Sequence, residues 1–326
     1  MNTIATTHRK NSLTYFNYIK LLSGTEIAII IGSLLSSLIA LILAVLNPIH
    51  YPYLTMPVSV DGIAAMPALT ILLIISKMMY YKKNNSAWLV CAALLITLNI
   101  TITTIFGLSS IMLTPYPRID VFLNHLDHCL GFNLPTLMAW KRNNPIYLQG
   151  CTIAYYSWIY QIILLPILVT ILGNYRRATR FYFSFVSALL VGSLIYYFWP
   201  TTAPATVMHS RYFTYGEHNL VQNFLLMRAG KEHLLPTSGL ISFPSFHLIG
   251  ATLVMLLIWK NKILRWPFLG LNIILTFATL YMGFHYLVDL IAGIAIAIIC
   301  FYLSGIISKK YDRSIHLKNF AKSTRS

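Results

Sequence analysis

Long apolar runs constrain this sequence more than any other feature, because a helix needs roughly 20 apolar residues to cross the hydrocarbon core of a bilayer. The candidate spans are 26–47, 62–81, 87–108, 151–173, 182–200, 245–259, 266–283 and 285–307. Only 10% of the 326 residues are charged, whereas a soluble domain carries about a quarter. The sequence therefore predicts an all-α, polytopic membrane helical bundle of about eight transmembrane helices, and it excludes a water-soluble enzyme and a disordered chain.

The excess of positive charge predicts the topology of this bundle. The net charge is +16, and the short connections are basic. Their basic residues are Lys82, Lys83, Arg176, Arg177, Arg180, Lys260, Lys262 and Arg265. The longer segments 109–150 and 201–244 mix both signs of charge. Since Lys and Arg favour the cytoplasmic side, we expect both termini in the cytoplasm and both long loops outside, and we expect no nucleic-acid partner.

Ionisable residues near the spans divide into two kinds. Glu26 and Lys77 lie near predicted span ends, where their side chains can snorkel to the interface. The others form two short clusters at outer span ends, where an ionisable residue is a functional candidate.

The first cluster is Ser242-Phe243-Pro244-Ser245-Phe246-His247, at the start of the sixth predicted span. Pro244 suits a first helical turn, because its missing N–H would be unpaired there in any case. The free N–H groups of the helix start and the Ser245 hydroxyl would form an anion site, with His247 one turn inside. A histidine at a span end is, however, often only an interfacial residue.

The second cluster contains His285 and Asp289, at the start of the eighth predicted span. Residues four apart share one helical face, so Asp289 can accept a hydrogen bond from one ring nitrogen of His285 and leave the other nucleophilic. Such a pair can also be structural. Together, on one membrane face and in separate helices, His285, Asp289 and His247 supply a nucleophile, its orienting group and a second acid–base group, which favours a catalytic site.

The first outer loop contains a predicted amphipathic helix. Its apolar residues at helical spacing are Ile119, Phe122, Leu123, Leu126 and Leu130. This pattern favours a helix that lies in the interface or packs over the spans. His125 and His128 lie one turn apart in it, a spacing that could bind a metal, but no further ligands are evident, and we favour polar residues on the wet face.

Three motifs give the sequence a family resemblance. Pro-Ser-x-His at 244–247 followed by His-x-x-x-Asp at 285–289 resembles the type 2 phosphatidic acid phosphatase superfamily. Tyr-Tyr-Phe-Trp-Pro-Thr-Thr-Ala-Pro at 196–204 resembles a segment of the inositol phosphorylceramide synthase branch, and 127–133 is similar to an outer-loop segment of its bacterial members. The arginine that the phosphatases carry six residues before the second histidine is replaced by Thr279.

The resemblance implies a mechanism and a site. His285 would form a phosphohistidine, Asp289 would stabilise the imidazolium, and His247 would protonate the leaving alkoxide and then act as a base on the acceptor. The expected phosphate-binding residues are Ser245, Arg228, Arg211 and Lys231, the last three as replacements for the missing arginine. Histidine and basic residues supply what a divalent ion otherwise would, so we expect no metal and no cofactor.

The resemblance also implies a substrate and a domain organisation. We expect a lipid phosphate substrate within the bilayer and a phosphotransferase that moves a phosphate-containing head group at the outer face of a bacterial inner membrane. The alternatives are a lipid phosphate or polyprenyl pyrophosphate phosphatase with water as acceptor, and a membrane transporter. The expected segments are a cytoplasmic segment at 1–25, accessory helices at 26–104, the phosphatase-like membrane domain with a core of six helices at 105–307, and a basic cytoplasmic tail at 308–326.

Overall fold

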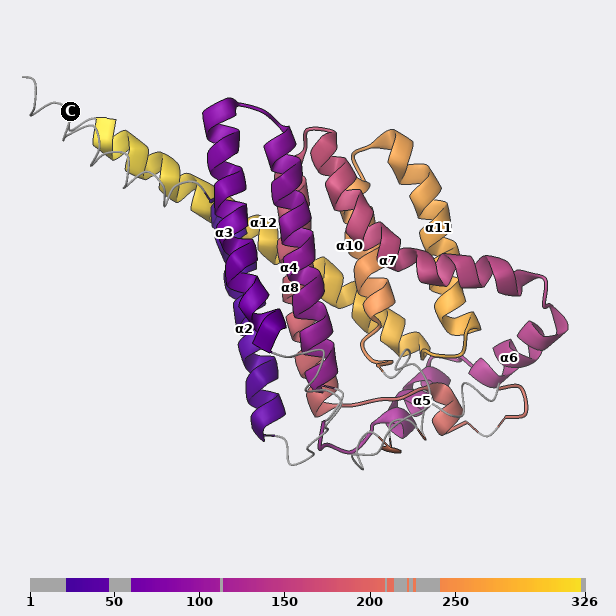
Figure 1. The fold of residues 1–326 in the computed structure, drawn as a ribbon. Helices are drawn as coiled ribbons and strands as arrows, with labels where there is room; N and C mark the ends of the chain where they lie inside the picture. The colour runs from indigo at the N-terminus through magenta and orange to yellow at the C-terminus, as the bar shows by residue number, and fades with distance from the viewer. Residues whose placement is uncertain are drawn as a thin grey trace, which may run out of the picture.

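The computed structural model describes residues 22–46, 60–111, 114–208, 210–213, 222, 225–226 and 241–323. These residues form helices and contain no strand (Figure 1). The elements are α2 (Gly24–Leu46), α3 (Val60–Lys83), α4 (Ala87–Ile111), α5 (Asp120–Cys129), α6 (Leu134–Asn143), α7 (Tyr147–Ile171), α8 (Tyr175–Phe198), η2 (Pro204–Thr206), α10 (Phe246–Ile258), α11 (Lys262–Tyr281) and α12 (Leu287–Ser323). Each predicted span corresponds to one of them, so the predicted all-α membrane bundle is confirmed.

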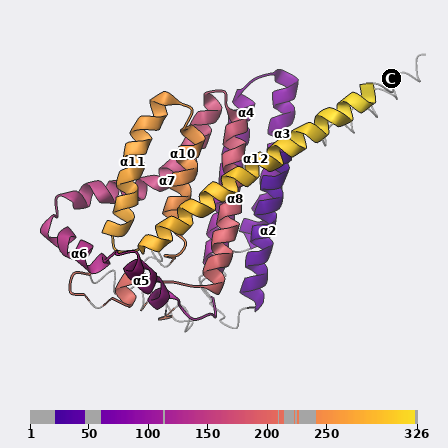
Figure 2. The same ribbon diagram turned by 180° about the vertical axis from the view of Figure 1, so that it is seen from behind.

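The helices differ in how well they suit a membrane. Among the described residues, α4, α7, α8, α11 and α12 contain segments long and apolar enough to cross a bilayer, and α2 and α10 contain shorter apolar segments. α12 continues to Ser323, through most of the segment predicted as a tail. It crosses the back of the bundle obliquely (Figure 2).

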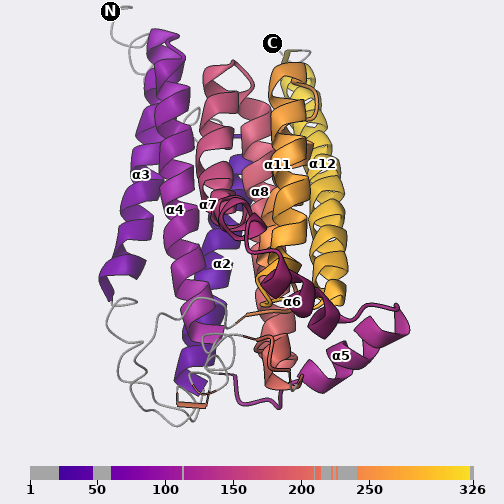
Figure 3. The ribbon, with the colours of Figure 1, turned by 90° about the vertical axis from the view of Figure 1, so that its right-hand side faces the viewer.

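α8 is the central helix of the bundle. It contacts α2, α4, α7, α10 and α12, and its buried aromatic side chains, including Phe181 and Phe185, belong to the main hydrophobic core. Viewed from the side, α3 and α4 lie at one edge of the bundle and α11 and α12 at the other (Figure 3).

The two ionisable residues expected to snorkel instead form a buried ion pair. Lys77 Nζ lies 3.1 Å from Glu26 Oε1, and Tyr175 donates a hydrogen bond of 2.5 Å to the same oxygen. Both side chains are buried. A charge taken out of water needs an opposite charge and hydrogen bonds, so this pair joins α2 to α3 and, through Tyr175, to α8.

α5 is a short helix at one end of the bundle, as predicted, but its buried face differs from the expected one. Leu123 is buried, whereas Phe122 and Leu130 are exposed. Asp120 and Asp127 are fully buried instead. The apolar pattern identified the helix but not its inner face, because tertiary hydrogen bonds rather than apolar burial decide which way this helix turns.

Candidate active site

The starts of α10 and α12 meet at one end of the bundle and bring the two sequence clusters together. Ser245 is the N-cap of α10: its Oγ accepts a hydrogen bond from the Leu248 N–H (3.4 Å), and its own N–H donates to the Asp289 carbonyl oxygen (3.1 Å). At Gly293, a Cβ would lie only 2.5 Å from the Ser245 carbonyl oxygen. The absence of a side chain at this position therefore allows α12 to approach the start of α10 closely.

Two details of the first cluster differ from the prediction. α10 begins at Phe246, so Pro244 precedes the N-cap and does not lie in the first turn. The Ser245 hydroxyl oxygen caps its own helix, a contact that the prediction did not include, and the hydroxyl hydrogen can still donate to an anion. Serine is a favoured N-cap because its oxygen accepts from an otherwise unpaired N–H group.

His285 is held in one tautomer by two acceptors. Its Nδ1 lies 3.0 Å from the Ser242 carbonyl oxygen and 3.3 Å from Asp289 Oδ2. A carbonyl and a carboxylate oxygen both accept hydrogen bonds, so Nδ1 carries the proton. Nε2 then keeps its lone pair and is available as a nucleophile. The predicted contact between His285 and Asp289 is therefore present, with a second acceptor that the sequence did not indicate.

Asp289 is a fully buried carboxylate fixed by several donors. Its Oδ2 accepts a hydrogen bond of 2.5 Å from the Ser242 hydroxyl and one of 2.8 Å from the Tyr286 N–H, in addition to the imidazole. Ser242 thus contacts both members of the pair, through its carbonyl and its hydroxyl. Ser242 belongs to the first sequence cluster, but its contact with the pair could not be predicted, because it lies 43 residues before His285 in the chain.

His247 lies beside His285. Their ring centroids are 5.5 Å apart and their ring planes are inclined by 77°. Two aromatic rings of α7 pack on His247: Tyr155 at 4.2 Å and Trp158 at 4.9 Å between centroids. This wall restricts the orientation of the His247 ring, so both imidazoles are held in fixed positions beside each other.

Asp127 of α5 caps the N-terminus of α12. Its two carboxylate oxygens accept hydrogen bonds from the Leu287 N–H (2.8 Å) and the Val288 N–H (3.0 Å). Burial raises the pKa of this carboxyl group, and the two N–H donors oppose that shift. A negative charge at a helix N-terminus is stabilising. Asp127 therefore positions the first turn of α12, which carries Asp289 and begins two residues after His285.

Asp120 links α5 to the Pro-Thr-Thr-Ala-Pro segment. It accepts hydrogen bonds from the Thr202 N–H (3.0 Å) and the Tyr286 hydroxyl (3.1 Å). Burial raises its pKa to about 6, although these donors and the Arg118 guanidinium lower it. The neighbouring Thr201 hydroxyl accepts from the Phe243 N–H (2.8 Å). The segment thus connects the outer helix to both sides of the site.

The structure describes only one of the three predicted phosphate-binding cations. Arg211 is exposed and contacts the neighbouring Tyr212, and no contact joins it to the two imidazoles within the described part of the chain. Arg228 and Lys231 lie outside the described residues. Thr279, at the place of the family's arginine, is buried and bonds to the Thr276 carbonyl of its own helix.

One cation near the site was not among the predicted ligands. Arg118 Nη1 donates to the Thr202 hydroxyl (2.9 Å) and lies 3.7 Å from Asp120 Oδ2. Its guanidinium therefore belongs to the hydrogen-bond network that reaches Tyr286, the neighbour of His285. The sequence does not single out Arg118, which lies in the segment 109–150 of mixed charge, because nothing local distinguishes it.

The described residues contain no group of three or more His, Cys, Asp and Glu side chains that could hold a metal ion. His125 and His128 are both exposed, and His125 Nδ1 lies 3.5 Å from Cys129 Sγ.

Comparison with known proteins gives two matches. The family model of the PAP2 superfamily matches residues 121–303. Undecaprenyl-diphosphatase BcrC of Bacillus subtilis (strain 168) is 31% identical over 71 residues, which are 22% of this chain and 37% of that protein. The chain thus spans little more than a third of the length of this relative. No solved structure matches.

Proposed function

This chain belongs to the PAP2 superfamily, a superfamily of phosphatases, and on that premise we propose that it hydrolyses a lipid phosphate or diphosphate through a phosphohistidine on His285. One observation carries the proposal. His285 Nδ1 is held by the Ser242 carbonyl and Asp289, and the His247 ring lies 5.5 Å from the His285 ring. Nucleophile, orienting carboxylate and acid–base group are thus adjacent in space.

The first half-reaction uses both imidazoles. Nε2 of His285 attacks the phosphorus atom of the substrate, and the bond from phosphorus to the leaving oxygen breaks. Protonated His247 gives its proton to that oxygen, and the positive charge that develops on His285 is stabilised by Asp289 through Nδ1. A positioned acid–base group of this kind typically contributes about 10²–10⁴-fold in rate.

In the second half-reaction, His247 takes a proton from the acceptor, which attacks the phosphohistidine. With water as acceptor, inorganic phosphate leaves and His285 is regenerated. With a lipid alcohol as acceptor, the phosphorus-containing group is transferred. Both reactions share the first step.

Water is the acceptor that the comparisons favour, because the relative reported above is named an undecaprenyl-diphosphatase. This reverses the order in which the sequence motifs ranked the two reactions. Head-group transfer remains the second candidate function, because Thr279 stands where the phosphatases carry an arginine and because residues 196–204 resemble the synthase branch. Membership of the PAP2 superfamily does not support the transporter alternative.

The transferring phosphate needs fixed donors for its negative charge. Backbone N–H groups at the start of α10 point in the direction that favours an anion. Arg118 is our additional candidate for the cation, beside Arg211, Arg228 and Lys231. We place the site at the outer face of the membrane and both termini in the cytoplasm on the basis of the charge distribution alone.

The test uses the purified full-length protein in mixed micelles. It receives a prenyl diphosphate or phosphatidic acid with a ³²P-labelled terminal phosphate and, separately, a phospholipid with a labelled head group. We expect free phosphate from the first substrate and no new phospholipid from the second. Transfer of the labelled head group would establish the second candidate instead.

The covalent step is tested with the same substrates. Rapid acid-free quenching should give an alkali-stable, acid-labile phosphoprotein in the wild type, and His285→Ala should give neither label nor turnover. Full turnover by His285→Ala would refute the phosphohistidine mechanism.

A further inference from the structure

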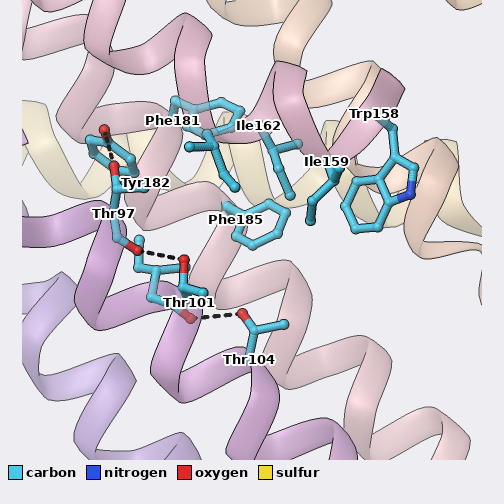
Figure 4. A pocket seen from close by; sticks show the side chains of 11 residues that line it. Thr97, Thr101, Thr104, Trp158, Ile159, Ile162, Phe181, Tyr182 and Phe185 are labelled. Carbon is cyan, nitrogen blue, oxygen red and sulfur yellow. Dashed lines mark hydrogen bonds between the residues drawn. The ribbon is translucent and has the colours of Figure 1, made fainter. Parts of the chain in front are cut away.

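An apolar pocket lies among α4, α7 and α8, next to the candidate active site. Its volume is about 190 Å³, and its lining includes Thr101 and Thr104 of α4, Trp158 and Ile159 of α7, and Phe185 of α8 (Figure 4). A dry apolar cavity of about 150 Å³ is large enough to bind benzene. The pocket can therefore accommodate a segment of a hydrocarbon chain.

The threonines of α4 do not make this pocket polar. The Thr101 hydroxyl donates to the Thr97 carbonyl (2.9 Å) and the Thr104 hydroxyl to the Ile100 carbonyl (2.8 Å), both in the same helix. Thr97 is likewise bonded to the Ala93 carbonyl and to the Tyr182 hydroxyl. Since these hydroxyls are already satisfied, they need no water, and the remaining lining is aromatic and aliphatic.

Trp158 is shared between the pocket and the candidate active site. Its ring lines the pocket, and its centroid lies 4.9 Å from that of His247. The ring packs over Gly250, where a Cβ would meet the Trp158 ring at 3.2 Å. A single side chain thus separates the pocket from the acid–base histidine.

The pocket lies deeper in the bundle than the site. Gly192 of α8 lies against the start of α10, because a Cβ at this position would be only 3.0 Å from the Phe246 ring. Phe185 precedes Gly192 by seven residues, which is about 10 Å along the helix axis. The segment that follows α8 contacts the candidate site through Thr201 and Thr202. A lipid with its phosphate at the two imidazoles would therefore direct its chain toward the middle of the bilayer, where this pocket lies.

The pocket also opens toward the membrane. Phe181, Tyr182 and Phe185 at its floor are buried, whereas Ile159 at its rim is 41% exposed and Thr101 and Thr104 are half-buried. In a bundle surrounded by lipid, exposed apolar rims face hydrocarbon chains. A chain can thus enter between α4 and α7.

We propose that this pocket binds the proximal part of the substrate's hydrocarbon chain, with Trp158 as the boundary between chain and phosphate. The inference rests on the proposed function for the identity of the substrate as a lipid phosphate. α4 lies outside residues 121–303 that match the PAP2 family. The helices added before the matched region would thus contribute to the choice of lipid chain.

The kinetic test uses a substitution that fills the pocket. Thr101→Trp places a large ring in it, and Leu98→Trp, on the exposed face of the same helix and outside the lining, is the matched control. Each variant is assayed with a long-chain prenyl diphosphate and with a five-carbon prenyl diphosphate. We expect the ratio of kcat/KM for the long to the short substrate to fall at least tenfold in Thr101→Trp and to stay within twofold in Leu98→Trp. An unchanged ratio in an active, folded Thr101→Trp would overturn the inference.

A binding test does not depend on turnover. A long-chain prenyl diphosphate with a photoactivatable diazirine on its proximal chain is irradiated with the wild type and with His285→Ala, and labelled peptides are identified by mass spectrometry. Labels on Ile159, Phe185 or their neighbours, displaced by excess unlabelled diphosphate but not by a lipid without phosphate, support the inference. Labels at other residues would overturn the inference. Labelling that both lipids displace equally would also overturn it, because such labelling indicates a site for bulk lipid. Absence of hydrolysis with specific labelling of the pocket would refute the proposed function alone.

Discussion

Ser242→Ala is the sharpest test of how the candidate site is held. The substitution removes the hydroxyl that donates a hydrogen bond of 2.5 Å to Asp289 Oδ2. It keeps the backbone carbonyl that accepts a hydrogen bond from His285 Nδ1. Asp289 retains the Tyr286 N–H donor. The change therefore loosens the carboxylate without removing the nucleophile, its tautomer or the acid–base group.

The magnitude follows from the worth of that hydrogen bond. A hydrogen bond to a charged group contributes about 1.5–3 kcal/mol, and each 1.36 kcal/mol in the activation barrier is about tenfold in rate. If the bond holds Asp289 where it stabilises the imidazolium, kcat should fall roughly 10- to 100-fold. Asp289→Asn should lower it further, because it removes the negative charge itself and not one of its donors.

The control is a serine of the same burial at a distance from the site. Ser184 of α8 is fully buried, and its hydroxyl donates to the Arg180 carbonyl (2.8 Å) and lies 2.9 Å from Ser304 Oγ. Ser184→Ala should lower thermal stability by about 1 kcal/mol and leave kcat near the wild-type value.

The assay measures phosphate release and the rate of phosphohistidine formation in rapid-quench experiments, beside melting in detergent. A double mutant of Ser242→Ala with Asp289→Asn should be little slower than Asp289→Asn alone, because residues that share one interaction are not additive. Wild-type kinetics in Ser242→Ala, or an equal loss of rate in Ser184→Ala, would refute the assigned role of the Ser242 hydroxyl.

Three further predictions concern the supports of the site. Asp127→Ala should cost about 1–2 kcal/mol of stability through loss of the α12 cap and should also lower kcat, with kcat and the melting temperature measured in the same detergent. A loss of stability with full activity would contradict the positioning role of Asp127. Gly293→Ala should lower both melting temperature and kcat because its Cβ meets the Ser245 carbonyl at 2.5 Å, whereas Gly270→Ala, with open space around the new Cβ, should change neither; equal effects would be evidence against the close approach. The pKa of Asp120 is raised from 3.8 to about 6, so its contribution to stability is greatest below pH 4 and falls by up to about 3 kcal/mol as the pH rises through 6. Asp120→Asn should remove this part of the pH dependence of the free energy of unfolding. An unchanged pH profile in the variant would show that the carboxyl group does not titrate in this range.

The sequence by itself determined the class of fold and the local chemistry. Apolar runs of bilayer length identified the membrane-spanning helices, because a helix surrounded by lipid must be apolar over most of its length. The spacing of His285 and Asp289 predicted their contact correctly, but α12 begins only at Leu287, so His285 makes this contact from the segment just before the helix and not from within its first turn. Both are properties of nearby residues, which periodicity reports directly.

Only the tertiary structure decided how the two clusters are joined. Ser242 meets Asp289 across 47 residues, and Asp127 caps α12 across 160. No local pattern encodes such contacts, because they arise from the way α10 and α12 approach at Gly293 and from the rotation of α5. That rotation turns Asp120 and Asp127 inward, against the apolar pattern, where their carboxylates accept from the N–H groups of Thr202, Leu287 and Val288. Each of these N–H groups would cost about 1–3 kcal/mol if it were buried without a partner.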